Sequence, residues 1–321
     1  MVQEDILITD VLFVGPTEER RLEAAGYRID RLKESKASEE TLRDRIKGKV
    51  GYILGGIEQV TPKVLESADK LKAIVFTGSG YSEFIPALEE ATNRGIAIAN
   101  APGGNADAVA EYTVTLMLAM TRRIFELGRT GSSDFATTKS LKGQRVGIVG
   151  LGHVGTLVAR YLRSLGVREV NYFSRRRKYY LEAGLGLRYM DLNDLLKWSD
   201  IVTLHTSKDA GEHFIGESQL ALMHDGALLV NTSYPDAVDP EALKKELATK
   251  RLRAAFDAPP KGNFKDLPLT TFFSSNAQTA YNTEEAIQMV SEMVTTSLIN
   301  LLKTGDDIFL VNPQYKAHAR H

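Results

Sequence analysis

One glycine-rich segment constrains this chain more than any other feature. Residues 145–155 read RVGIVGLGHVG, which places Gly150, Gly152 and Gly155 in a GxGxxG spacing. An apolar run expected to form a strand precedes the glycines, and a stretch of helical periodicity follows them. In that context the glycines allow a tight turn, a close approach of the backbone to a pyrophosphate, and packing of the helix on the strand. The segment predicts a dinucleotide site at a helix N-terminus, with a turn that binds no ligand as the alternative.

The end of the next expected strand indicates which dinucleotide is bound. A carboxylate there selects NAD, whereas basic side chains accommodate the 2′-phosphate of NADP. Residues 173–178 read FSRRRK, so no carboxylate stands at the strand end. The hydroxyl of Ser174 can donate to a phosphate oxygen, and the guanidinium groups of Arg175 and Arg176 can bind it in a bidentate manner. We expect NADP(H) to be preferred and NAD(H) to be possible. The alternative is a solvated basic turn.

Composition argues against several other kinds of site and partner. The 321 residues include 40 basic and 41 acidic side chains, so the formal net charge is −1 and nothing favours nucleic acid or an anionic membrane. Cysteine is absent, and the six histidines form neither an HExxH nor a His-x-His pair, so no metal site is expected. The N-terminus lacks the apolar region of a signal peptide, and no apolar run approaches the roughly 20 residues of a membrane span. We expect a cytoplasmic protein.

Short apolar runs alternate with helical patterns along the chain. Most of these runs are continuously apolar, as in strands that are buried on both faces of a parallel sheet. The alternation predicts an α/β fold with right-handed crossovers, and the length suggests two domains. Long helices are expected over about 106–127, after Gly155 and over about 284–302. The expected strands are Ile6–Ile8, Val11–Val14, Tyr52–Leu54, Ala73–Phe76, Ile96–Ala99, Arg145–Gly150, Val170–Phe173, Ile201–Leu204, Ala227–Val230, Ala254–Phe256 and Thr271–Phe273.

Further motifs make the sequence similar to the D-2-hydroxyacid dehydrogenase family over nearly its whole length. Besides the glycine-rich turn, they are residues 71–81 (LKAIVFTGSGY), 100–111 (NAPGGNADAVAE), 199–205 (SDIVTLH), 226–232 (GALLVNT), 280–286 (AYNTEEA) and 311–313 (VNP). The resemblance implies two Rossmann-like, doubly wound parallel-sheet domains with a cleft between them. Residues 1–100 with 288–321 would form a flavodoxin-like substrate-binding domain, and residues 101–287 the dinucleotide-binding domain. It also implies a small-molecule substrate and a homodimer formed largely through the second domain.

The same resemblance implies roles for individual residues on the cofactor side. His153 and Val154 would present backbone N–H groups to the pyrophosphate. Thr232 and His205 would line the path of the ribose and nicotinamide, and Asp257 would hold the nicotinamide carboxamide. The alternatives are a packed strand histidine for His205 and a strand-end turn residue for Asp257.

The substrate loop of the family is matched by Gly78, Ser79, Gly80 and Tyr81. The family's catalytic positions, however, are where this sequence departs from the pattern. An Arg in the pattern N-T-x-R-G is replaced by Tyr234 in NTSYP.

The other two catalytic residues of the family also lack a counterpart. No carboxylate occupies the place of the family's Glu in residues 257–262 (DAPPKG). The family's His aligns with Gln278, or with Asn276 if the gap is placed differently, and neither side chain can donate a proton in turnover.

Two classes of function therefore compete. In the first, an NADP(H)-dependent oxidoreductase transfers hydride to a carbonyl or imine through a rebuilt site, and Tyr234 donates the proton or polarises the carbonyl. A pKa lowered by nearby Lys261 would help Tyr234, while Tyr81 and Gln278 would orient the substrate. Alternatively, Tyr234 only fills the space of the missing Arg. In the second class, the protein binds NADP(H) without turnover and serves as a scaffold. The unchanged family reaction, D-2-hydroxy acid to 2-oxo acid, is the less favoured form of the first class.

Overall fold

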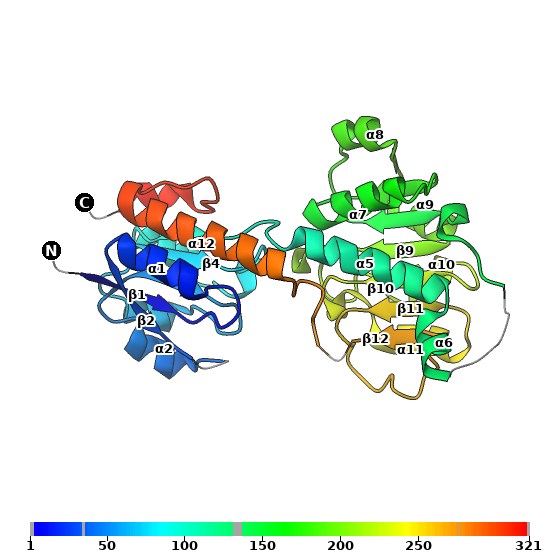
Figure 1. Cartoon of the computed structure of the whole chain (residues 1–321), viewed down its shortest axis with the longest axis horizontal. Helices are drawn as coiled ribbons and strands as arrows, with labels where there is room; N and C mark the ends of the chain where they lie inside the picture. Colours follow the sequence, from blue (N-terminus) through cyan, green and yellow to red (C-terminus); the bar gives the residue numbers. More distant parts are fainter. Residues whose placement is uncertain (1–2, 34–35, 131–136, 276, 320–321) are drawn as a thin grey trace. The chain divides into compact units, whose positions relative to one another are not determined.

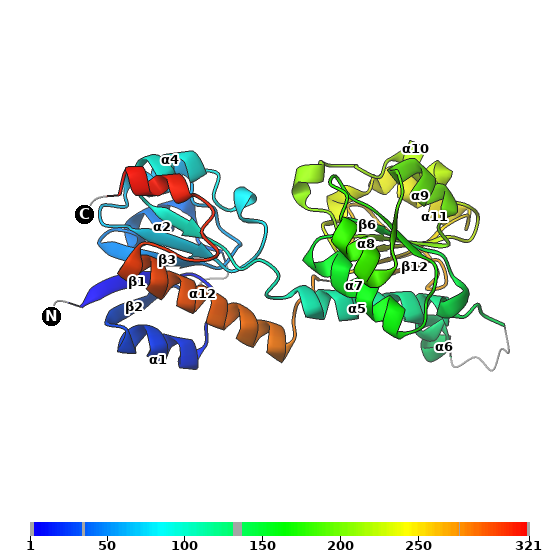
Figure 2. The ribbon, with the colours of Figure 1, turned by 90° about the horizontal axis from the view of Figure 1, so that it is seen from above.

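Two compact units make up the chain. The structure is a computed structural model, and it describes residues 3–33, 36–130, 137–275 and 277–319. One unit comprises residues 1–105 with 283–321, and the other comprises residues 106–282 (Figures 1 and 2). The sequence-based boundaries, after residue 100 and before residue 288, differ from these divisions by five residues each.

The first unit is built on a five-stranded parallel sheet. Its strand order is β2-β1-β3-β4-β5, the flavodoxin-like order of a doubly wound sheet. Every residue of β3 and β4 is buried, as expected of central strands in a parallel sheet, although β3 begins with the charged Lys49. The strands are β1 (Glu4–Ile8), β2 (Tyr27–Arg31), β3 (Lys49–Leu54), β4 (Ala73–Phe76) and β5 (Ala97–Ala99).

Helices cover both faces of this sheet. The long helix α12 (Glu284–Thr304) packs with α1 (Pro16–Ala24) on one face, where a Cβ at Gly51 would touch Leu298 (Figure 1). On the other face, apolar residues of three shorter helices share one buried cluster with the strands. These helices are α2 (Glu39–Arg45), α3 (Pro62–Glu66) and α4 (Leu88–Asn93).

One expected strand of this unit is wrong, and one observed strand was not expected. Residues 11–14 form no strand, because the Asp10 carboxylate accepts hydrogen bonds from the backbone N–H groups of Phe13 and Val14, both at 2.7 Å, and so holds this segment in a loop. The strand beside β1 is instead β2, which the sequence reading missed. Strand β2 contains charged residues, which interrupt the apolar pattern expected of a strand. These residues pair with residues of the neighbouring strand β1, as Arg28 does with Asp5 at 2.7 Å.

The second unit contains a seven-stranded parallel sheet of order β12-β11-β10-β9-β6-β7-β8. This is the Rossmann order, extended by one strand at the β12 edge. Its strands are β6 (Val146–Val149), β7 (Val170–Phe173), β8 (Arg188–Tyr189), β9 (Ile201–Leu204), β10 (Leu228–Asn231), β11 (Arg253–Phe256) and β12 (Phe272–Ser274). The two-residue strand β8 was not expected from the sequence.

Alternate residues of the central strands enter two separate cores. In β10, Leu228 and Val230 pack toward α5 (Ala106–Thr121) and α7 (His153–Ser164), whereas Leu229 packs toward the opposite face. That face is covered by α9 (Leu192–Trp198), α10 (Glu217–Leu222) and α11 (Pro240–Ala248), as Figure 2 shows. Helix α8 (Tyr179–Leu185) follows β7.

The helix expected over residues 106–127 is divided in two. Helix α5 ends at Thr121, and α6 (Ile124–Thr130) begins after Arg123, whose φ of +57° interrupts the helical backbone. None of the helices formed by the described residues has the length and apolar character needed to cross a membrane.

Candidate cofactor-binding and active site

The three glycines of the turn between β6 and α7 meet different steric demands. Gly150 has a φ of +98°, and a Cβ there would collide with the carbonyl oxygen of His205. A Cβ at Gly155 would collide with the carbonyl oxygen of Gly150. By contrast, no atom lies within 4 Å of a Cβ built at Gly152. The fold itself therefore requires two of the glycines, whereas Gly152 leaves open space for a ligand beside the backbone.

Helix α7 begins with backbone N–H groups that no side chain caps. Its N-cap is Gly152, and the first hydrogen bond of the helix runs from Thr156 N to Gly152 O at 3.0 Å. The N–H groups of His153, Val154 and Gly155 have no acceptor among the described residues. They also lie at the positive end of the helix dipole, so they can donate to the oxygens of a phosphate.

This turn lies at the topological switch point of the sheet. Strands β6 and β9 are neighbours, and doubly wound sheets bind ligands where such a pair diverges at its carboxyl ends. His205 follows β9, and its Nε2 lies 2.9 Å from the hydroxyl oxygen of buried Thr203. Burial lowers the pKa of His205 to about 3, so its imidazole is neutral at pH 7.

A cavity of about 850 Å³ opens at this switch point. It brings together six residues predicted for cofactor binding: Gly150, Gly152, Ser174, Arg175, Arg176 and His205. The predicted site residues did not include Lys178, Phe214 or the loop of residues 206–210, of which all but Lys208 also line the cavity. The one signal that could have predicted this role of the loop is its position directly after β9, the strand next to β6. The cavity and the open N–H groups together fit a dinucleotide.

The basic turn after β7 keeps two of its three arginines unpaired. Arg177 forms an ion pair with Glu182 at 2.8 Å, which together with the hydrogen bond from Tyr172 lowers the pKa of Glu182 to about 2. Arg175 and Arg176 are exposed and make no ion pair with any described residue. The Ser174 hydroxyl donates to the carbonyl oxygen of Arg176 at 2.7 Å, which closes the turn. Arg175 and Arg176, which both line the cavity, therefore keep unpaired guanidinium groups.

Two further predicted cofactor residues, Thr232 and Asp257, lie at the ends of β10 and β11 and are buried. The Thr113 hydroxyl donates to Val109 O at 2.7 Å, so the Thr232 hydroxyl, 2.7 Å from it, donates to Thr113. Its remaining lone pairs can accept a hydrogen bond.

Asp257 anchors the loop that carries Gln278. Its Oδ1 accepts hydrogen bonds from the backbone N–H groups of Thr279 and Ala280, at 2.9 and 3.1 Å. Its Oδ2 has no hydrogen-bond partner among the described residues. One carboxylate oxygen thus has a structural role, and the other can meet a ligand.

Tyr234 has a different environment from the one expected. Its ring is buried in the apolar core, and its hydroxyl donates to Gly211 O at 2.8 Å. Its pKa is raised, not lowered, by burial and by the charges of Asp209 and Asp236. The expectation that Lys261 lowers this pKa is wrong, because Lys261 pairs with Asp236 at 3.2 Å.

The remaining predicted site residues lie in loops. Gln278 is exposed, and the alternative position Asn276 lies outside the described residues. In the first unit, the loop after β4 contains Gly78, Ser79 and Gly80 and leads to a 3-10 turn that begins at Tyr81. The loop is fastened by Asn100 Nδ2, which donates to Ser79 O at 2.8 Å. Across the described ranges, no cluster of three or more His, Asp or Glu side chains is arranged to hold a metal ion.

Comparisons with known proteins agree with this arrangement. Residues 114–272 match the family model of the D-isomer specific 2-hydroxyacid dehydrogenase, NAD binding domain. A glyoxylate reductase of Thermofilum pendens is 35% identical over 295 residues, which cover 86% of this chain and 85% of that protein. A glyoxylate reductase of Thermococcus litoralis is 33% identical over 310 residues, covering 89% and 91%. Among solved structures, a Thermus thermophilus protein has a TM-score of 0.84 at 27% identity, covering 96% of this chain and 99% of its own.

The fold and the glycine-rich site therefore define an NAD(P)-dependent oxidoreductase with two parallel-sheet α/β domains. The chain belongs to the D-isomer specific 2-hydroxyacid dehydrogenase family.

Proposed function

We propose that this protein uses NADPH in preference to NADH to reduce a small carbonyl or imine substrate. The observation that carries the proposal is the cavity at the β6–β9 switch point, whose wall after β7 consists of Ser174, Arg175, Arg176 and Lys178 and has no carboxylate at the strand end. A 2′-phosphate needs positive charge and hydrogen-bond donors at this place. The unpaired state of Arg175 and Arg176 supports the proposal, because no internal ion pair has to be broken.

The pyrophosphate would lie against the N–H groups of His153, Val154 and Gly155, beside Gly152. Thr232, His205 and the free Oδ2 of Asp257 would orient the nicotinamide end. When bound, the dinucleotide supplies the hydride.

We propose that Tyr234 delivers the proton or polarises the carbonyl, after its hydroxyl turns away from Gly211. The phenol of Tyr234 is neutral at pH 7 and can therefore donate a hydrogen bond to the carbonyl oxygen, although its raised pKa makes it a weaker acid than a free tyrosine. Gln278 and Tyr81 would orient the substrate through hydrogen bonds, together with the loop of Gly78, Ser79 and Gly80. The unit of residues 1–105 and 283–321 is proposed as the substrate-binding domain.

The substrate class extends from 2-oxo acids to aldehydes, ketones and imines. The relatives named above are glyoxylate reductases, so glyoxylate is the first 2-oxo acid to test. An Arg can clamp a carboxylate with two charged hydrogen bonds, whereas Tyr234 offers one neutral hydrogen bond. We therefore expect weaker dependence on a carboxylate next to the carbonyl.

The test is NADPH consumption, followed by its absorbance, with glyoxylate, hydroxypyruvate, aldehydes, ketones and cyclic imines. The proposal expects turnover on at least one substrate without a 2-carboxylate, and a loss of that turnover in Tyr234→Phe. Turnover confined to glyoxylate and hydroxypyruvate, and unaffected by Tyr234→Phe, would contradict the rebuilt site and leave the ordinary family reaction.

A second candidate is an NADP(H)-binding scaffold without turnover. The hydrogen bond from Tyr234 to Gly211 favours it, because the proposed proton donor is engaged by the protein. Tight NADPH binding, no turnover on the whole panel, and a partner captured only with NADPH would together support it. The homodimer and the cytoplasmic location expected from the sequence stay predictions.

A further inference from the structure

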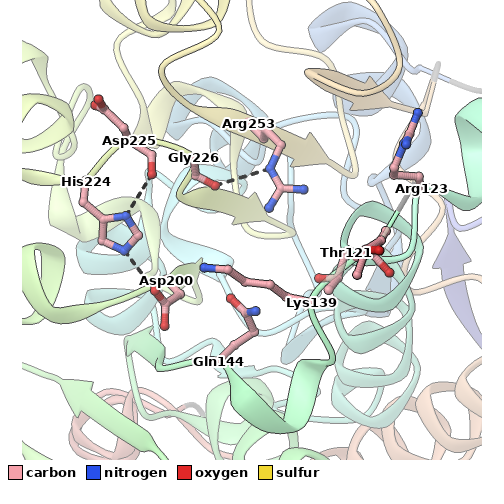
Figure 3. A pocket seen from close by; sticks show the side chains of 11 residues that line it. Thr121, Arg123, Lys139, Gln144, Asp200, His224, Asp225, Gly226 and Arg253 are labelled. Carbon is pink, nitrogen blue, oxygen red and sulfur yellow. Dashed lines mark hydrogen bonds and ion pairs between the residues drawn. The ribbon is translucent and has the colours of Figure 1, made fainter. Parts of the chain in front are cut away.

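A second cavity lies at the amino-terminal ends of the strands of the seven-stranded sheet, whereas the cofactor cavity lies at their carboxyl ends. Its volume is about 340 Å³, and its wall includes residues that precede or begin three strands: Asp200 before β9, Gly226 before β10 and Arg253 at the start of β11 (Figure 3). It shares no lining residue with the cofactor cavity. A ligand here would therefore occupy a separate site.

Two cations of this cavity lack an acidic partner. Arg253 is partly buried, and its pKa is lowered by desolvation with no carboxylate near enough to oppose the effect. Its two hydrogen bonds are long and go to carbonyl oxygens, those of Met120 at 3.3 Å and Gly226 at 3.4 Å. Lys139 also makes no ion pair with any described residue. Positive charge is thus held at this site without an internal anion to balance it.

Neither of the two acidic side chains in the wall, Asp200 and Asp225, forms an ion pair with these cations, and Asp225 lies 3.7 Å from Arg251 instead. Asp200 accepts hydrogen bonds from Arg145, at 2.8 Å from its backbone N and 3.1 Å from its guanidinium, and Nε2 of His224 lies 3.1 Å away. Burial alone would raise the pKa of Asp200, but the bonds and charge of Arg145 bring it below the ordinary value. The Asp200 charge is therefore already matched by Arg145. Arg123, on the other side, pairs with Glu126 at 2.7 Å.

Two buried polar side chains also line the wall, and one of them lacks a partner. Thr121 and Gln144 are each only 6% exposed. The Thr121 hydroxyl oxygen is buried with no hydrogen-bond partner, and Gln144 lines the same cavity. Figure 3 shows Gln144 and Lys139 reaching into the space below Arg253. Buried polar groups are normally satisfied, so the Thr121 hydroxyl points to a missing acceptor.

We propose that this cavity binds an oxyanion group, a phosphate or a carboxylate of a small molecule. The Arg253 guanidinium would supply charged hydrogen bonds, Lys139 a second positive charge, and Thr121 and Gln144 neutral donors. A guanidinium matches the geometry of both oxyanions, and its pairing with an anion would offset its desolvation.

The test is thermal unfolding of the full chain saturated with NADPH, which keeps added anions out of the cofactor cavity. Sodium phosphate or sodium acetate is raised at constant ionic strength, with chloride as the balancing anion. We expect a saturable rise in Tm with at least one of them, because a ligand that binds only the folded state stabilises it. A larger rise with phosphate would identify a phosphate site, and a larger rise with acetate a carboxylate site.

Three variants test the location of the site, and a fourth variant serves as the control. Arg253→Gln, Lys139→Gln and Thr121→Val should each reduce the anion-dependent rise in Tm by about half or more. Thr121→Val should not lower the Tm without anion, because its hydroxyl has no partner to lose, so it tests the site even if Arg253→Gln fails to fold. Arg168→Gln, an exposed cation before β7 that does not line the cavity, should keep the full rise. No saturable rise, or an equal rise in all variants, would overturn the proposal.

Discussion

The hydroxyl of Tyr234 donates a hydrogen bond to the backbone carbonyl oxygen of Gly211, at a distance of 2.8 Å. Gly211 closes the 3-10 turn of Lys208–Ala210, part of which lines the cofactor cavity. One side chain at the end of β10 therefore fastens the loop after β9, and its ring is at the same time packed in the apolar core. Tyr234 is thus linked to the wall of the cofactor cavity.

Replacement of Tyr234 by Phe separates the chemical role from the structural one. As the proton donor, Tyr234 should matter for the chemical step, so kcat should fall by about 100-fold or more while KM for NADPH changes little. The lost hydrogen bond alone should lower the free energy of unfolding by only about 1 kcal/mol. Steady-state kinetics and urea unfolding measure the two effects. An unchanged kcat with a raised KM for NADPH would leave Tyr234 as a positioning residue for the 208–210 turn.

The glycine-rich turn offers a matched pair of substitutions. In Gly152→Ala the new Cβ meets no protein atom, so the free energy of unfolding should change by less than about 0.5 kcal/mol. The same methyl group would occupy the space beside the open N–H groups, and we expect the Kd for NADPH to rise at least tenfold. Gly155→Ala should instead destabilise the fold strongly, because its Cβ collides with Gly150 O. Equal effects of Gly152→Ala on stability and on binding would show that Gly152 is structural too.

Neutral His205 makes stability depend on pH. Its pKa is lowered from 6.5 to about 3 by burial, so between these values the unfolded chain binds a proton that the folded chain does not. Stability should therefore fall as the pH drops below about 6.5, by at most about 1.4 kcal/mol for each pH unit. Urea unfolding of the wild type and His205→Gln at several pH values measures this contribution. Identical slopes for the two proteins would contradict it.

Asp257 can be tested with two substitutions that differ in one respect. Asn keeps an oxygen that can accept from the N–H groups of Thr279 and Ala280, whereas Ala removes it. Asp257→Asn should therefore preserve slow hydrogen exchange at residues 279–280 but weaken NADPH binding, because the second carboxylate oxygen is lost. Asp257→Ala should lose both the slow hydrogen exchange at residues 279–280 and the tight binding of NADPH. If Asp257→Asn binds NADPH as well as the wild type, the carboxylate has only the structural role.

Local patterns in the sequence were sufficient to predict the central strands of both sheets. The continuous apolar runs of β3, β4, β9 and β10 predicted buried parallel strands, and the structure confirms them. The edge strand β2 was not predicted from the sequence, because its polar residues are stabilised by pairs such as Arg28–Asp5, which form only when the sheet has formed. The loop at residues 11–14 was mistaken for a strand because the Asp10 cap does not alter the apolar pattern.

The candidate site, too, could be predicted only where its residues form a local pattern in the sequence. The glycine spacing and the FSRRRK run are local, so they were enough to nominate five residues that line the cofactor cavity, and the family resemblance added His205. The partner of Tyr234 lies 23 residues earlier in the chain, and the partner of Lys261 is Asp236 rather than Tyr234. Pairings of this kind follow from tertiary packing, which neither spacing nor composition encodes.

The choice between the two dinucleotides is the most direct test of the account. Fluorescence titration of the protein with NADPH and with NADH gives both Kd values without requiring any turnover. We predict that NADPH binds at least tenfold more tightly, and that Arg175→Ser with Arg176→Ser removes this preference while Arg168→Ser, at the other end of β7, keeps it. Equal or tighter binding of NADH by the wild type would contradict the assignment of the basic turn to a 2′-phosphate.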